Sequence, residues 1–171
     1  YCRASIGTVS HLPVLRLAPV KENRNNCPFL TGDRCAIHDA EPLVCALYPL
    51  AQEISRKGQV SYFLQPTGCG GQVIEARVQD YLARYDVPAR EAIDVRWAQT
   101  CMALEDTVER LEEVLSPVLV RRMQAKLWQA LYFGYDYAQD YLPQLEANLQ
   151  TLDTELRKLT EYQKKRNDSS K

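Results

Sequence analysis

Apolar residues in the C-terminal part of the chain recur at helical spacing. One row, with alternating steps of four and three, predicts a helix from about residue 88 to 115: Trp97, Cys101, Leu104, Val108, Leu111 and Leu115. A second row predicts a helix that starts near Pro143: Leu142, Leu145, Leu149, Leu152, Leu156 and Leu159. Two such rows favour bundle packing over an exposed coiled coil, while the C-terminal leucine row would also suit a homodimer or a protein partner.

Two further segments complete the helical part. Residues 73–85 carry apolar side chains at helical spacing and predict a first helix that ends before Pro88. Pro117 stands where a proline is tolerated in a first turn, and it opens a third helix. The apolar face of that helix consists of Val120, Met123, Leu127, Leu131 and Gly134.

The N-terminal part lacks a sustained helical period. Residues 12–20 suit one short extended segment, and residues 41–48 suit one short helix. Residues 52–64 predict a β-hairpin around the turn Arg56-Lys57-Gly58. The predicted fold is therefore mainly α: a Cys-rich irregular N-terminal section with a small β-hairpin, packed on a bundle of three to four helices.

Composition divides the chain near residue 73. Five of the six cysteines, six of the nine prolines and six of the seven glycines precede residue 74. We expect a Cys-rich, metal-binding section over 1–73 and a helical section over 74–171, joined in a single compact domain. The polar tail 164–171 is expected to fray.

Charge and hydropathy exclude two classes of partner. Lys and Arg number 21 against 22 Asp and Glu, so the net charge of −1 argues against a nucleic-acid binder. No apolar run approaches the roughly 18 residues that a membrane span needs. Hydrophobic residues at 46% and charged residues at 25% are typical of a globular protein.

The main candidate for chemistry is a set of cysteines beside proline or glycine turns: Cys27, Cys35, Cys45 and Cys69. None forms a Cys-x-x-Cys pair, so the pattern is neither that of a zinc ribbon nor that of a thioredoxin. Thiolates select zinc or the irons of an iron–sulfur cluster. The alternatives are two disulfides, or separate buried thiols that fill gaps in the core.

Several short motifs resemble the YkgJ-like cysteine-cluster family, described as zinc- or iron-chelating domains. They are Cys27-Pro28-Phe29-Leu30, Arg34-Cys35-Ala36-Ile37, Pro42-Leu43-Val44-Cys45, Tyr48-Pro49 and Cys69-Gly70. The resemblance covers residues 1–71. It also implies that Cys2 is the last position of an upstream Cys-x-x-Cys-x-x-Cys-Cys cluster, and hence a fifth metal ligand whose companions lie before Tyr1.

The chain departs from the family pattern at three positions. His38 stands where the family usually has Tyr, and both Glu41 and Ala46 stand where it has Arg. Loss of two cations beside thiolates removes local charge compensation, which alters metal affinity or redox potential. His38 is a weaker ligand candidate, and Cys101, on an apolar row, is expected to be a buried inert thiol.

The sequence thus predicts a metal-binding protein, with a zinc ion or an iron–sulfur cluster in a structural or redox-sensing role. Two alternatives are a helical protein-interaction module and a protein-modifying transferase that uses the cluster; no nucleophile motif identifies an enzyme. With Cys101 set apart in the core, five thiols make a poor disulfide framework. We therefore expect reduced cysteines and a cytoplasmic location.

Overall fold

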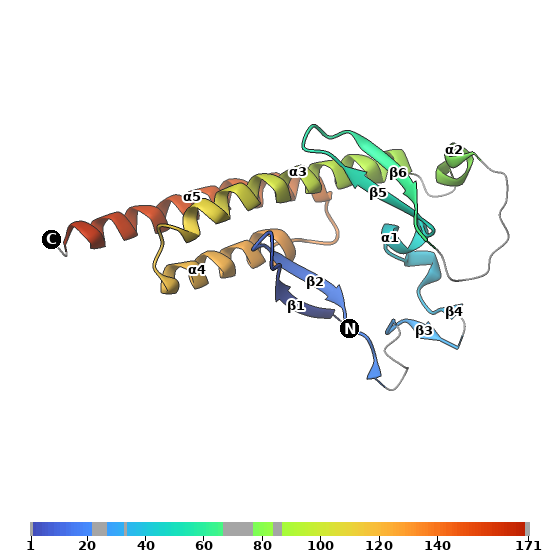
Figure 1. Cartoon of the computed structure of the whole chain (residues 1–171), viewed down its shortest axis with the longest axis horizontal. Coiled ribbons are helices and arrows are strands. Elements are labelled where there is room, and N and C mark those ends of the chain that lie inside the picture. Colours follow the sequence, from blue (N-terminus) through green and yellow to red (C-terminus); the bar gives the residue numbers. More distant parts are fainter. Residues whose placement is uncertain (1, 22–26, 33, 67–76, 84–86, 170–171) are drawn as a thin grey trace. The chain divides into compact units, whose positions relative to one another are not determined.

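The computed structural model describes residues 2–21, 27–32, 34–66, 77–83 and 87–169 (Figure 1). Contacts divide the chain into two compact units. Unit 1 is Ala18–Met102, and unit 2 combines Cys2–Leu17 with Ala103–Lys171. The division falls inside a helix because the N-terminal residues pack with the C-terminal helices. The boundary predicted at residue 73 lies outside the described residues and stays a prediction.

Unit 2 is built on long helices. They are the C-terminal part of α3 (Val87–Glu112), α4 (Pro117–Trp128), a π-helical continuation η4 (Gln129–Phe133), and α5 (Tyr141–Asp168). Pro117 is the first residue of α4, where its missing N–H costs nothing. The mainly α prediction is confirmed. The last helix continues to Asp168, beyond the start of the tail that was expected to fray.

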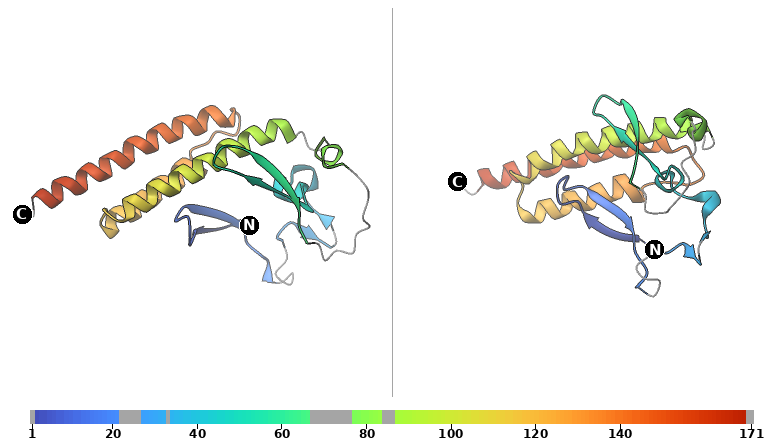
Figure 2. Two further views of the ribbon diagram at one scale, coloured as in Figure 1. Left: turned by 45° about the horizontal axis from the view of Figure 1, so that its top comes forward. Right: turned by 45° about the vertical axis from the view of Figure 1, so that its right-hand side comes forward.

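Most of the core of unit 2 comes from the predicted apolar rows, but on α4 Leu119 is buried, whereas the predicted Val120 is half-buried. Its fully buried side chains are Val108, Leu119, Met123, Leu127 and Leu145. Leu152 and Leu156 are also buried, and α5 contacts both α4 and η4 (Figure 2). Burial of this leucine row within one chain supports bundle packing for it.

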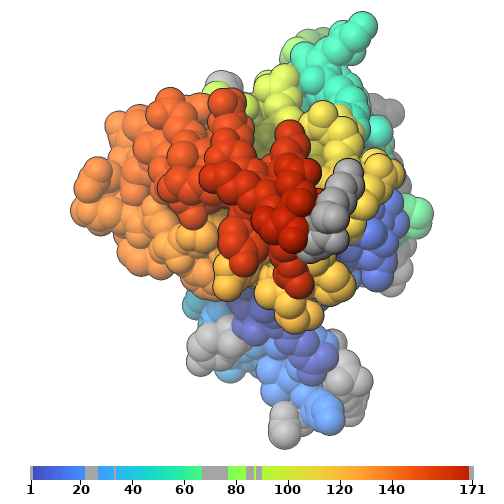
Figure 3. Space-filling view, turned by 90° about the vertical axis from the view of Figure 1, so that its left-hand side faces the viewer, coloured from blue at the N-terminus to red at the C-terminus, as the bar shows by residue number. Residues whose placement is uncertain are grey.

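A strand pair completes unit 2, of which one strand lies in the extended segment expected over residues 12–20 and the other was not predicted. β1 (Cys2–Ile6) and β2 (Pro13–Leu17) are antiparallel, with Cys2 opposite Leu17. Tyr132 Oη donates to the Pro13 carbonyl at 3.1 Å. β2 contacts α4, and the blue strand pair borders the α4 surface in Figure 3.

Unit 1 consists of short elements and the N-terminal part of α3. They are β3 (Leu30–Thr31), β4 (Arg34–Cys35), η2 (His38–Ala40), α1 (Leu43–Ala46), β5 (Leu50–Ile54), β6 (Val60–Leu64) and α2 (Val78–Leu82). β5 and β6 form the predicted hairpin, with Ile54 opposite Val60. Gly58 in its turn has φ 76°, a conformation that favours glycine.

None of the helices in the described ranges combines the length and apolar character needed to cross a membrane.

Candidate metal centre

Two of the predicted ligands lie on a tight loop in unit 1. The Leu30 N–H donates to the Cys27 carbonyl at 3.1 Å, which turns the chain directly after the first thiol. β3 then pairs with β4 so that Leu30 lies opposite Cys35, with Gly32 at φ 60° in the turn between them. Cys27 is exposed and Cys35 is half-buried. Backbone pairing thus brings the two cysteines to the same end of a small hairpin.

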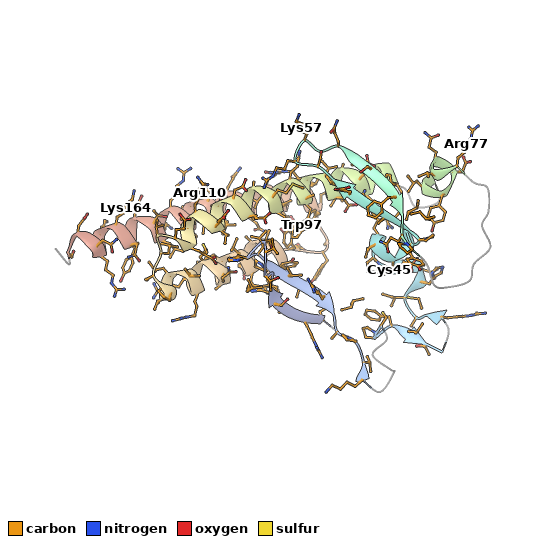
Figure 4. The ribbon with its side chains drawn as sticks, in the orientation of Figure 1. Cys45, Lys57, Arg77, Trp97, Arg110 and Lys164 are labelled. Atoms are coloured by element: carbon orange, nitrogen blue, oxygen red, sulfur yellow. The ribbon has the colours of Figure 1, made fainter. Side chains whose placement is uncertain are left out.

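The third cysteine lies on the short helix α1. The Cys45 N–H donates to the Pro42 carbonyl at 2.8 Å, so the proline immediately before the helix starts its first turn. Tyr81 of α2 holds the C-terminal end of α1, since its hydroxyl donates to the carbonyls of Tyr48 at 2.7 Å and Ala46 at 3.2 Å. Cys45 is exposed on this anchored turn (Figure 4).

Cys27 and Cys35 both influence the ionisation of Cys45. The pKa of Cys45 is raised above its usual value, first by burial, then by the negative charge of Glu41, and then by Cys27 and Cys35. His38 Nδ1 lies 3.4 Å from Glu41 Oε1 at the edge of the same group. Cys27, Cys35 and Cys45 are therefore close enough for their charges to interact.

Cys27, Cys35 and Cys45 lie near one another, but they do not form a complete set of metal ligands. Within the described residues, no group of three or more His, Cys, Asp or Glu side chains is placed to hold one metal ion. The donor chemistry nevertheless fits a soft or borderline metal, because Cys27, Cys35 and Cys45 carry free thiols.

The other two predicted ligands are not among the described residues of unit 1. Cys2 is exposed on β1 and belongs to unit 2. Cys69 lies outside the described residues. Cys101, expected to be a buried thiol, is half-buried on α3.

Glu41 is the functional neighbour that the sequence reasoning undervalued. In the sequence it stands out only as a position where the family has Arg. Its carboxylate nevertheless raises the pKa of Cys45 more than any other charge does, second only to burial. The available signal was that Glu41 is the acidic residue nearest to Cys45 in the sequence.

Comparisons with protein-family models, with curated proteins and with solved structures found no match. The resemblance to the YkgJ-like family therefore depends on the motifs within residues 1–71 alone.

Proposed function

We propose that Cys27, Cys35, Cys45 and Cys69 bind a zinc ion or an iron–sulfur cluster, with Cys2 as a fifth contributor. The role is structural or redox-sensing, in a cytoplasmic protein. The observation that supports the proposal is the placement of Cys27 and Cys35 close enough to raise the pKa of Cys45, although Cys27 and Cys45 are 18 positions apart in the sequence (45 − 27).

A bound cation would reverse the electrostatic balance at this group. Burial, the negative charge of Glu41 and the neighbouring Cys27 and Cys35 oppose ionisation of Cys45. A metal ion ligates the deprotonated thiol and offsets the repulsion between these negative charges. Binding would then draw the β3–β4 hairpin and α1 onto one centre, which compensates for the scarcity of regular structure in this section.

Metal analysis of the full chain, purified without oxygen, tests the proposal. We expect stoichiometric zinc in a colourless protein, or iron and sulfide in a brown one. Single changes Cys27→Ser, Cys35→Ser and Cys45→Ser should each reduce the metal content severalfold. Cys101→Ser is the matched control, because Cys101 lies on α3 outside the group, and it should keep the metal.

Two results would contradict the proposal. One is a full-length protein with neither iron nor zinc, and the other is equal metal loss in Cys101→Ser and in the three site variants. Thiol titration of the unfolded, metal-stripped protein under non-reducing conditions tests the redox state. Close to six free thiols supports reduced cysteines, matching the six in the sequence, and close to none excludes them.

A further inference from the structure

A cavity of about 380 Å³ lies within unit 1, between α1, β5 and the N-terminal part of α3. Most of its wall is apolar, and the principal side chains are Leu43, Leu47, Leu50, Ile54, Trp97 and Ala98. Val44, which is 73% exposed, lies at its margin, so the cavity is accessible from solvent. Its volume is within the range of small-molecule sites. Figure 4 labels Trp97 on α3 and Cys45 on α1.

One side chain in this mostly apolar wall is charged. Asp94 is the one charged residue among the described residues that line the cavity, and its Oδ2 is buried with no hydrogen-bond partner. Buried carboxylate oxygens nearly always have a partner, because an unpaired one loses the hydration it had in water. Asp94 therefore provides an unused acceptor in an apolar cavity.

Three of the polar groups nearby are already paired with one another. Gln52 Nε2 donates to Tyr62 Oη at 3.2 Å, and Tyr62 Oη in turn donates to Glu91 Oε2 at 2.9 Å. Burial raises the pKa of Asp94, the charge of Arg90 opposes that shift, and the charge of Glu91 adds to it. A cationic donor at Asp94 would provide the missing partner.

We infer that this cavity binds a small primary amine with an apolar body, its ammonium paired with Asp94 and its hydrocarbon part against Leu47, Ile54 and Trp97. A neutral hydrocarbon would leave Oδ2 unpaired, and an anion would be repelled by the carboxylate. The ammonium supplies a charge-assisted hydrogen bond, the kind that contributes most in a poorly hydrated site. This inference is independent of the metal centre.

Calorimetric titration of the full chain near neutral pH tests it with three probes of similar size: phenethylamine, phenethyl alcohol and phenylacetate. We expect the amine to bind at least about tenfold more tightly than the alcohol, and phenylacetate to bind most weakly. Asp94→Asn should remove the preference for the amine while it keeps the volume of the side chain. Asp106→Asn, on the same helix but outside the cavity, is the matched control and should keep the preference.

A second variant tests the location. Ala98→Leu places extra carbons in the cavity and should weaken amine binding at least about tenfold, while circular dichroism verifies that the helices are intact. Equal affinity for amine and alcohol, an unchanged preference in Asp94→Asn, or unchanged binding in a folded Ala98→Leu would each overturn the inference. So would the absence of binding by all three probes.

Discussion

Lys126 Nζ of α4 lies 2.9 Å from Glu155 Oε2 of α5, so one ion pair joins two helices that the leucine row already packs together. Lys158 Nζ binds the other carboxylate oxygen at 2.7 Å. These contacts lower the pKa of Glu155 from 4.5 to about 2, and the hydrogen bond from Lys158 makes the largest contribution. One carboxylate thus has a cation on each side.

Glu155→Gln should lower the thermal unfolding midpoint slightly at neutral pH and low salt. The contribution of Glu155 is present above about pH 4.5 and is lost as the pH falls towards 2, because the folded-state pKa is the lower one. Calorimetry in low and high salt checks this, since screening should shrink the difference. Asp153→Asn, which breaks a pair within α5 alone, is the control and should have a smaller effect. A salt-independent difference would contradict this explanation.

His11 should make the stability of unit 2 depend on pH. Its Nδ1 contacts the Glu112 carboxylate, and this hydrogen bond, with the charges of Glu112 and Glu109, raises the pKa of His11 above 6.5. The stabilisation is complete below about pH 6.5 and is lost as the pH rises through the raised value.

Thermal unfolding over a pH series measures the effect of this pair. Glu112→Gln should flatten the dependence on the alkaline side of pH 6.5, whereas His38→Gln, which changes the other histidine, should leave it intact. If stability changed with pH equally steeply in Glu112→Gln and in the unchanged protein, the His11–Glu112 pair could not be the cause of that dependence.

Leu145→Ala should destabilise the protein by about 2–5 kcal/mol, because Leu145 is completely buried and the cavity left behind is only partly refilled. Leu149→Ala, on the same helix at a half-buried position, should cost clearly less. Urea unfolding followed by circular dichroism compares the two. Equal losses would show that burial against α4 and η4 does not determine the stability of the bundle.

Gly134→Ala should destabilise the end of η4 by about 1–3 kcal/mol for steric reasons. Its φ of −91° suits any residue, but an added Cβ would lie 3.0 Å from Asn148 Nδ2 and 3.1 Å from the Gln129 carbonyl oxygen. Asn148→Ala removes the first conflict along with the hydrogen bond to the Gly134 carbonyl. The double variant should therefore lose less stability than the sum of the single variants, and simple additivity would refute the clash.

The helices were predictable because each apolar row is long enough to fix its period. Strand β1 was not predicted: Cys2, Ala4 and Ile6 alternate with the polar Arg3 and Ser5, but all five residues are exposed, so the alternation marks no buried face. Its placement depends on contacts distant in sequence, such as Gln124 Nε2 donating to the His11 carbonyl at 2.8 Å. Local sequence patterns do not indicate contacts between residues so far apart in the chain.

The metal site at the cysteines stays a prediction. Turn residues beside Cys27, Cys35 and Cys45 indicated a common centre, and the pKa of Cys45 reflects its two neighbours. Asp94 escaped notice, although its position three residues before Trp97 extends the apolar row of α3 by one helical step. A carboxylate at such a position was the available signal, and only the packing of α1 and β5 shows that it borders a cavity.

The pairing of the first strands with the last helices imposes an order on biosynthesis. Residues 18–102 of unit 1 are contiguous, so they can close on themselves as they leave the ribosome. The β1–β2 pair emerges before unit 1, but its partners Glu112 and Gln124 follow 101 and 113 residues after His11. These strands therefore wait for their native contacts until all of unit 1 has been synthesised, and their exposed strand edges need protection during that interval.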